Sequence, residues 1–446
     1  MALLVHKYGG SSVEDADKIR NVACRIARAK ESGSDVVVVV SAMGDTTDAL
    51  IQLANSVSRE PHPRELDLLL STGELVSCTL LTMALRDLGH EAISLSGPQA
   101  GILTDTSHGR ARIHRVETGR VQEELKRGRI VVVAGFQGIT DAQDVTTLGR
   151  GGSDTTAVAL AAALGASRCE IYTDVDGIYT ADPKVVPQAR KLEEIGFEEM
   201  LELANYGAKM HPRSIELGAV YRVPIYVASS FNDSPGTLIH GGWDSTVDER
   251  LGTDGELHPS SPDPRRPIGI SSIGAPPTGI PPTGIPMEDR IKVTGIALNA
   301  NLAKITVRSV PDRPGVAAAL FEPLAQAAIS VDTIVQNTSE DRTTDISFTV
   351  NRNDLPAALK KVKQLTAELG AGGVASDDSL ASVSIVGSGM QNSPGYASRM
   401  FRVLANGNVN IDMITTSEIR ISCIIKENDA HEAVRLLHEG FDLDRV

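Results

Sequence analysis

The stretch His6-Lys7-Tyr8-Gly9-Gly10-Ser11-Ser12-Val13 decides how the N-terminal half of the chain folds. An apolar run at residues 2–5 leads into it and an amphipathic segment at residues 13–30 leads out, so the pattern predicts a strand, a glycine turn and a helix. The paired glycines let the backbone approach an anion, the helix start offers unpaired N–H groups, and Lys7 adds a positive charge. The stretch is typical of a phosphate site, although an ordinary turn with a surface lysine is the commoner structure for such a stretch taken alone.

The length and composition of the chain limit the classes of protein to which it can belong. The 446 residues are too many for one compact core and predict two or three domains. Hydrophobic residues make up 41%, which is ordinary for a water-soluble protein. The formal net charge of −14, with no basic stripe between aromatic residues, argues against a nucleic-acid-binding surface.

The cysteines and the apolar runs indicate the compartment. The four cysteines have neither CxxC nor Cys/His metal spacing, which disfavours a disulfide framework and a zinc site and fits a reducing environment. The N-terminus lacks the succession of a signal peptide, and no apolar run is expected to reach the length of a membrane span. We therefore expect a cytoplasmic protein that binds neither membrane nor nucleic acid.

Short β-branched runs alternate with helical segments through the first half of the chain, at residues 36–40, 130–134, 171–173 and 224–227. Such alternation is typical of an α/β fold, in which helices cover both faces of a mostly parallel sheet. We assign residues 1–240 to this domain. Residues 241–287 lose all periodicity, are rich in Pro, Gly and Ser, and contain a tandem Pro-Pro-Thr-Gly-Ile copy, which predicts a linker.

Past the linker the sequence repeats itself. Residues 303–307 and the pair Pro314-Gly315 recur as residues 381–385 and Pro394-Gly395, with the two glycines 80 positions apart. Each copy continues with further strands and a second helix, at residues 355–369 in the first copy and 430–439 in the second. The pattern predicts two ferredoxin-like βαββαβ modules, at residues 288–372 and 373–446.

Three more turns in the first half carry glycine or acidic residues, at 41–44, 148–156 and 173–179. All three are expected at the carboxyl ends of parallel strands, where α/β sheets collect ligands. The middle turn places Arg150 and Ser153 ahead of a helix, which suits a carboxylate or a phosphate. Asp154 has the alternative role of a helix N-cap, and Asp174 and Asp176 have that of plain turn residues.

Several common sites are excluded. The sequence has no P-loop pattern and no Gly-x-Ser-x-Gly elbow, and its histidines form no catalytic cluster. Gly387-Ser388-Gly389 resembles the start of a dinucleotide fingerprint, but the third glycine is missing and the stretch falls inside a repeat module.

Taken together, the motifs resemble those of aspartate kinases in the amino-acid kinase superfamily, and the two C-terminal modules resemble ACT domains. The resemblance covers nearly the whole chain. The motifs occur in the family's order: Lys7-Tyr8-Gly9-Gly10-Ser11-Ser12-Val13, Ser41-Ala42-Met43-Gly44, Ser71-Thr72-Gly73-Glu74, Gly149-Arg150-Gly151-Gly152-Ser153-Asp154-Thr155-Thr156, Thr173-Asp174-Val175-Asp176-Gly177-Ile178-Tyr179-Thr180-Ala181-Asp182-Pro183 and Tyr206-Gly207-Ala208-Lys209.

The resemblance implies transfer of the γ-phosphoryl group of ATP to the side-chain carboxylate of L-aspartate, the first step towards lysine, threonine and methionine. Magnesium would come with ATP, and the protein itself would have no separate metal site. Because an aspartate side chain is ionised at neutral pH, with a pKa of about 3.9, no general base is needed. Cations and backbone donors must instead neutralise charge in the transition state.

The family pattern also assigns roles to residues of this chain. The implied catalytic residues are Lys7, Arg150, Asp154 and Lys209. The implied aspartate-binding residues are Ser41, Thr47, Glu74, Arg150, Gly151, Gly152 and Ser153. The implied nucleotide-binding residues are Lys7, Tyr8, Gly9, Gly10, Ser11, Thr173, Asp174, Tyr179, Asp182, Lys184 and Lys209.

ACT domains of this family bind amino acids between paired modules, which implies inhibition by lysine, threonine or both, and a homo-oligomer or hetero-tetramer. The implied effector-binding residues are Asp312, Gly315, Ala317, Gln336, Asn337, Asn410, Ile411, Ser417 and Glu418. By the same pattern the strand at 291–298 pairs into the second module. Met287 resembles an internal start at which some relatives make a separate regulatory subunit.

Three features depart from the family pattern: a loop around Lys209 that is one residue shorter, the long linker, and Tyr396-Ala397 in place of a small residue followed by threonine. One alternative function is a kinase for glutamate, carbamate or a nucleotide. Another is an inactive amino-acid sensor. For the ACT modules alone, the alternative role is a scaffold that only mediates dimerisation. The complete set Lys7, Glu74, Arg150 and Asp154 favours an active enzyme.

Overall fold

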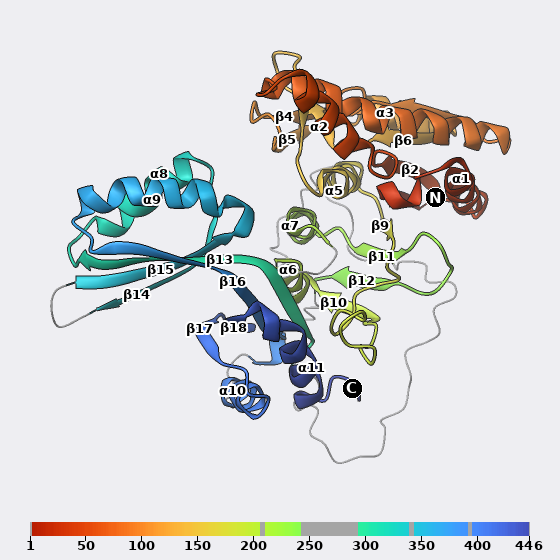
Figure 1. The fold of residues 1–446 in the computed structure, drawn as a ribbon. Coiled ribbons are helices and arrows are strands. Elements are labelled where there is room, and N and C mark those ends of the chain that lie inside the picture. Colours follow the sequence, from red (N-terminus) through yellow and green to blue (C-terminus); the bar gives the residue numbers. More distant parts are fainter. Residues whose placement is uncertain (1, 206–209, 242–292, 339–342, 391–394, 446) are drawn as a thin grey trace, which may run out of the picture. The chain divides into compact units, whose positions relative to one another are not determined.

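The computed structural model describes residues 2–205, 210–241, 293–338, 343–390 and 395–445 (Figure 1). Most of the linker, Met287 and Lys209 lie outside the described residues. The chain divides into two compact units. The N-terminal unit comprises Met1–Ile178, Lys191–Ala204 and Lys209–Gly284, and the C-terminal unit comprises Tyr179–Arg190, Asn205–Ala208 and Ile285–Val446. The expected boundary at residue 240 therefore differs from the division in space, because Tyr179–Arg190 groups with the second unit.

An eight-stranded, mostly parallel sheet forms the N-terminal unit, as the alternating pattern predicted. Only the β11–β12 pair is antiparallel among its neighbours. In sheet order the strands are β10 (Glu194–Gly196), β12 (Thr237–His240), β11 (Ile225–Ser229), β9 (Arg168–Thr173), β1 (Leu3–Tyr8), β2 (Asp35–Val40), β6 (Ile130–Ala134) and β3 (Ala92–Leu95). A small second sheet has the order β5 (Ile113–Val116), β4 (Ile102–Thr104), β7 (Gln137–Ile139) and β8 (Val145–Thr147).

Helices cover both faces of the large sheet. One apolar cluster joins Val36, Val38 and Val40 to α1 (Ala16–Glu31) and α3 (Pro63–Asp87). The opposite face contacts α5 (Gly152–Leu164), which is buried along most of its length. The five valines of β2 face both sides alternately and are all fully buried, which is why this strand is apolar throughout rather than alternating. The remaining helices of the unit are α2 (Thr46–Val57), α4 (Gly119–Lys126), α6 (Phe197–Asn205) and α7 (Pro212–Tyr221).

The registers of the parallel strands place several turns at one edge. Tyr8 lies beside Val40 and Tyr172, and Val40 lies beside Ala134, so the turns after β1, β2, β6 and β9 open together. The prediction was wrong for the turn at 148–152, which follows β8 of the small sheet. Packing of α5 against β1 and β2 brings that turn to the same edge by another route.

Helix α3 corrects one expectation. Within the described ranges it is the one helix that is long and apolar enough to span a membrane by length and composition alone. Half of its most apolar window is buried inside the unit, and Asp67 and Glu74 lie on its buried side. This arrangement is that of a core helix that carries polar groups inward.

The C-terminal unit contains one six-stranded antiparallel sheet in the order β14 (Val331–Thr338), β15 (Thr343–Asn351), β13 (Gly295–Pro311), β16 (Gly373–Val386), β18 (Arg420–Lys426) and β17 (Ile411–Thr416). Its helices are α8 (Val316–Gln326), α9 (Leu355–Leu369), α10 (Tyr396–Asn406) and α11 (Ala430–Gly440). Gly315 and Gly395 have φ angles of 91° and 110° and begin α8 and α10, so the two repeats enter their helices in the same way.

Two long strands serve both halves of this sheet. The start of β13 contributes Ile296 to the core around α10 and α11, whereas its later residues Ile305 and Val307 join the core around α8 and α9. Strand β16 pairs with β13 along both parts. The two βαββαβ modules are therefore interleaved through their central strands.

Candidate active site

A cavity of about 660 Å³ opens at the edge of the large sheet where the turns meet. All of its walls belong to the N-terminal unit. It brings together ten of the residues singled out in the sequence: Lys7, Gly10, Ser41, Thr47, Glu74, Arg150, Gly151, Gly152, Ser153 and Asp154. They come from β1, the short helix at Gly10–Ser12, the turn after β2, α2, α3, the turn before α5 and the first residues of α5.

Lys7 and Asp154 form the charged centre of the cavity. Lys7 lies inside β1, one residue before its end, and its Nζ is 2.6 Å from Oδ1 of Asp154. Both side chains are only 11% exposed, so the contact is a partly desolvated ion pair. The N-cap of α5 is Gly151, so Asp154 lies inside the helix and the alternative cap role is wrong.

The close approach of neighbouring atoms requires glycine at two of these positions. A Cβ at Gly10 would lie 2.8 Å from the carbonyl oxygen of Ala42, because the turns after β1 and β2 touch there. Gly151 has a φ of 68° and a Cβ on it would lie 2.2 Å from Cγ of His211. Both positions therefore exclude any side chain.

Gly151→Ala is expected to destabilise the protein, because alanine would add a left-handed backbone cost of about 1–2 kcal/mol and a clash with His211. Gly165→Ala is the matched control, since Gly165 ends the same helix with a φ of 63° and nothing within 4 Å. Urea unfolding of both variants measures the difference. Equal losses of stability would contradict the contribution of the clash.

Glu74 is the most unusual side chain in the cavity. One carboxylate oxygen accepts a hydrogen bond from the Ala42 N–H at 3.1 Å, while Oε2 has no hydrogen-bond partner among the described residues. The residue is 3% exposed, and burial raises the pKa of Glu74 to about 7. A cation placed beside Oε2 would complete this site and restore the charged form.

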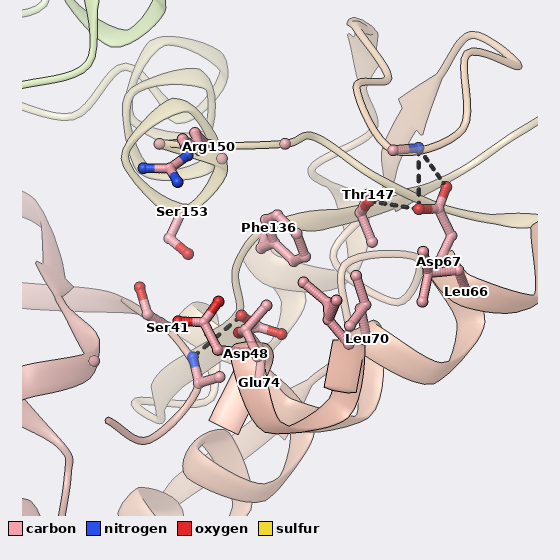
Figure 2. A pocket seen from close by; sticks show the side chains of 18 of the residues that line it. Ser41, Asp48, Leu66, Asp67, Leu70, Glu74, Phe136, Thr147, Arg150 and Ser153 are labelled. Carbon is pink, nitrogen blue, oxygen red and sulfur yellow. Dashed lines mark hydrogen bonds between the residues drawn. The ribbon is translucent and has the colours of Figure 1, made fainter. Parts of the chain in front are cut away.

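Figure 2 shows how the other polar groups face the cavity. Ser41, Asp48 and Glu74 lie on one side, and Arg150 and Ser153 lie on the other. Arg150 is exposed on the turn before α5. The cavity thus offers two cations and one buried acidic group with an unpaired oxygen.

The expected nucleotide-binding residues at the end of β1 have different surroundings. The ring of Tyr8 is fully buried on the opposite face and stacks on Tyr172, with centroids 5.0 Å apart, so only its backbone is near the turn. The Gly9 N–H donates to the carbonyl oxygen of Tyr172 at 3.3 Å. Gly10 lines the cavity, and Ser11 is exposed in the short helix that follows.

The remaining nucleotide-site residues lie elsewhere. Thr173 ends β9 and Asp174 follows it at the same sheet edge, outside the cavity wall. Tyr179, Asp182 and Lys184 belong to the C-terminal unit. Lys209 lies outside the described residues.

The expected effector residues all fall in the C-terminal unit. Asp312, Gly315 and Ala317 are exposed at the start of α8, and Gln336 and Asn337 lie in the edge strand β14. Asn410 and Ile411 lie at the start of the other edge strand, β17, and Ser417 and Glu418 form the turn that follows it.

The sequence analysis missed Asp67, Phe136 and Thr147, which also line the cavity. Asp67 is 1% exposed and accepts hydrogen bonds from Thr147 Oγ1 at 2.5 Å and from the Gly109 N–H at 3.0 Å (Figure 2). It lies seven residues before Glu74 on the same face of α3. That helical spacing was the signal that could have identified it.

Comparison with known proteins identifies the family to which the chain belongs. The model of the amino acid kinase family matches residues 2–229, and ACT-domain models match residues 304–367 and 383–441. The aspartokinases of Mycolicibacterium smegmatis and Pseudomonas aeruginosa are each 48% identical to this chain. The alignments cover 99% and 100% of this chain and 97% and 98% of those relatives.

Solved structures agree in fold. E. coli aspartokinase III in complex with aspartate and ADP matches with a TM-score of 0.76 and 27% identity, over 99% of this chain and 100% of that one. The same enzyme in complex with lysine and aspartate matches with a TM-score of 0.68 and 26% identity, over 98% and 99%. The chain therefore belongs to the amino acid kinase family, whose members are phosphotransferases. Within that family its full-length relatives are aspartokinases, and its activity is that of an aspartate kinase with ACT regulatory domains.

Proposed function

We propose that the cavity binds L-aspartate and that its side-chain carboxylate oxygen attacks the γ-phosphorus of ATP. The bond between the γ-phosphorus and the bridging oxygen to the β-phosphorus breaks, which gives 4-phospho-L-aspartate and ADP. The nucleophile carries its charge already, so the protein needs no proton acceptor. Its task is to hold two anions in line and to neutralise the charge on the transferred group.

The unpaired Oε2 of Glu74 is the observation that carries the proposal. It would accept the ammonium group of aspartate, which is the cation that the buried carboxylate lacks. Arg150 would bind the α-carboxylate through two parallel hydrogen bonds. Ser41, Thr47, Gly151, Gly152 and Ser153 supply hydroxyl and backbone donors around the same space.

Lys7 would neutralise the γ-phosphoryl oxygens as they gain charge. Asp154 holds the Lys7 ammonium within 2.6 Å and so orients it before substrate arrives. Thr173, Asp174, Tyr179, Asp182, Lys184 and Lys209 are the proposed nucleotide-binding residues.

Magnesium would enter with ATP. The described residues contain no group of three or more His, Cys, Asp or Glu side chains that could hold a metal ion, so phosphate oxygens and water would be most of its ligands.

The finer regulation belongs to the same proposal. E. coli aspartokinase III has been solved with lysine, and the effector positions of the two repeats here are candidates for lysine, threonine or both. We further propose that the enzyme is cytoplasmic, acts in the synthesis of lysine, threonine and methionine, and assembles through its ACT modules as a homo-oligomer or with a subunit started at Met287.

Coupled release of ADP from MgATP and L-aspartate is the direct test, and we expect turnover that saturates with aspartate. Glutamate, carbamate and nucleotides are the matched alternative acceptors. Turnover with one of these but not with aspartate would overturn the proposed acceptor. Stabilisation by lysine or threonine without any turnover would instead indicate an inactive sensor.

A further inference from the structure

The segment at residues 179–190 belongs to the C-terminal unit although the chain on either side of it belongs to the N-terminal unit. The chain leaves the N-terminal unit after Ile178 and returns at Lys191. At the base of this excursion the Thr180 N–H donates to the Arg190 carbonyl oxygen at 2.9 Å. Tyr179, Asp182 and Lys184, three of the proposed nucleotide-binding residues, lie on this segment.

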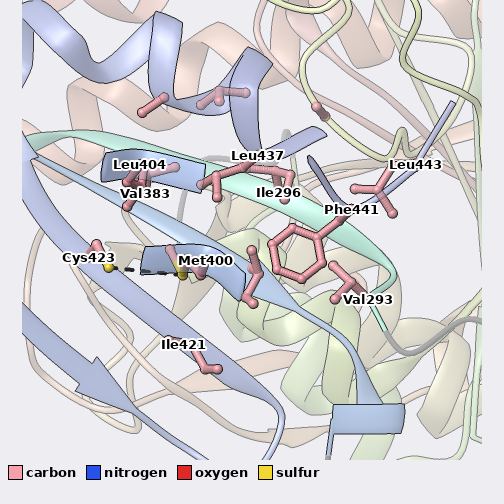
Figure 3. Packing of buried hydrophobic residues seen from close by; sticks show 14 of the residues in the cluster. Val293, Ile296, Val383, Met400, Leu404, Ile421, Cys423, Leu437, Phe441 and Leu443 are labelled. Atoms are coloured by element: carbon pink, nitrogen blue, oxygen red, sulfur yellow. Dashed lines mark hydrogen bonds between the residues drawn. The ribbon is translucent and has the colours of Figure 1, made fainter. Parts of the chain in front are cut away.

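The apolar side of the segment is buried in the core of the second module. Ala181, Val185 and Val186 are 3%, 9% and 3% exposed and belong to the cluster formed by α10, α11, β16 and β18. Figure 3 shows the centre of that cluster, including Met400, Leu437 and Phe441. The segment is therefore part of the folded ACT module and not a surface loop.

Hydrogen bonds also hold the segment in place. Oγ1 of Thr180 lies 2.9 Å from Nε2 of His438 in α11, and both residues are 2% exposed. The Ile296 N–H of β13 donates to the Thr180 carbonyl oxygen at 2.7 Å, and Nε of Arg435 donates to the Val185 carbonyl oxygen at 3.1 Å. Strands and helices of the second module thus hold both ends of the buried stretch.

The polar side of the segment faces outward. Asp182 and Lys184 are exposed, and Oδ1 of Asp182 accepts the Lys184 N–H at 2.9 Å, which forms a tight turn. The buried valines follow this turn directly, so its conformation depends on their packing.

We propose that the second ACT module fixes the conformation of the turn at residues 179–184, in which Thr180 and His438 are positioning residues that hold Tyr179, Asp182 and Lys184 in place for ATP. This inference rests on the proposed nucleotide-binding role of those three residues.

The same core offers a path for regulation that does not pass through the linker. Ile411, one of the expected effector residues, packs against the cluster that contains Val185 and Val186. A ligand that moves the start of β17 acts on the packing that holds the nucleotide-binding turn.

Thr180→Val is the main test, because valine keeps the shape of threonine and removes only the hydroxyl group. We expect it to raise the KM for ATP and the Kd of MgADP about five- to tenfold, with kcat and the KM for aspartate changed less than about twofold. Thr180→Ser keeps the hydroxyl group and is expected to restore nucleotide binding. MgADP binding by calorimetry gives a readout independent of turnover.

A pair of core truncations separates positioning from general destabilisation. Val186→Ala in the segment and Val362→Ala in the core of the first ACT module remove the same two methyl groups from buried sites. Only Val186→Ala is expected to weaken MgADP binding. If the wild-type enzyme binds MgADP and both Thr180→Val and Val186→Ala bind it equally well, this inference is overturned while the proposed nucleotide site stands. A wild-type enzyme that fails to bind MgADP would overturn the proposed nucleotide site as well.

Discussion

Lys7→Ala is expected to lower kcat for aspartate-dependent ADP release by at least about 10²- to 10³-fold. The Lys7 ammonium lies beside the glycine turn after β1, since a Cβ on Gly9 would lie only 3.5 Å from its Nζ. It acts on charge that develops during transfer, so kcat should fall more than the affinity for aspartate. Steady-state rates at saturating MgATP and aspartate measure the effect.

The loss of Lys7 also leaves Asp154 as an uncompensated, mostly buried charge, which could reduce stability by itself. The double variant Lys7→Ala with Asp154→Asn removes both charges and is the control for folding. We expect it to regain thermal stability but not activity. A double variant that regains activity would mean that Lys7 acts only by balancing Asp154.

Effector binding gives a second control for Lys7. Calorimetric binding of lysine or threonine is expected to be the same in Lys7→Ala and in wild type, because the proposed effector residues belong to the C-terminal unit. Loss of effector binding together with turnover would indicate that Lys7 has a structural role instead.

The strands and both ACT repeats were predictable because their signals are local. The β-branched run at residues 36–40 needs burial on both faces, which only a sheet between two helical layers provides. The Pro-Gly pairs predicted two equivalent helix starts, and Gly315 and Gly395 indeed adopt the same left-handed conformation. Helix α9 begins and ends at the residues that the pattern predicted.

The site was only partly predictable, because several of its features depend on distant packing. Tyr8 occupies a motif position, but strand alternation turns its ring away from the cavity towards Tyr172. Asp67 has no local signal beyond its helical spacing from Glu74, and its side chain is held by hydrogen bonds to residues 42 and 80 positions away. Val185 and Val186 were not singled out in the sequence, because their burial depends on the core of the second ACT module.

Glu74 should make aspartate binding depend on pH. Its pKa is raised to about 7 by burial, whereas the bound ammonium group of aspartate favours the ionised form. Binding therefore releases a proton at low pH, and the apparent Kd for aspartate is expected to be about tenfold higher at pH 6 than at pH 8. Calorimetry in buffers of different ionisation enthalpy would detect the released proton.

Glu74→Gln is the matched variant, since it keeps the shape and removes the charge. It is expected to weaken aspartate binding about 10²-fold at pH 8 and to abolish the pH dependence. A wild-type Kd that stays constant between pH 6 and pH 8 would contradict an ionising Glu74 in the aspartate site.

The same variant should be more stable than wild type at high pH. The folded protein binds the Glu74 proton more tightly than the unfolded chain does, because the pKa rises from an ordinary value of 4.5 to about 7 on folding. The free energy of unfolding of wild type therefore falls as pH rises between these values, by up to about 3 kcal/mol, and stays level above pH 8. Glu74→Gln has no carboxyl group to titrate, so its free energy of unfolding does not show this decrease. Plotted against pH, the free energies of unfolding of the two proteins, measured with urea, should have equal slopes above pH 8 and different slopes between pH 5 and pH 7. A variant that is more stable than wild type cannot have lost aspartate binding through unfolding. This result would therefore show that the buried, unpaired carboxylate of Glu74 lowers the stability of the folded protein but is needed to bind the substrate.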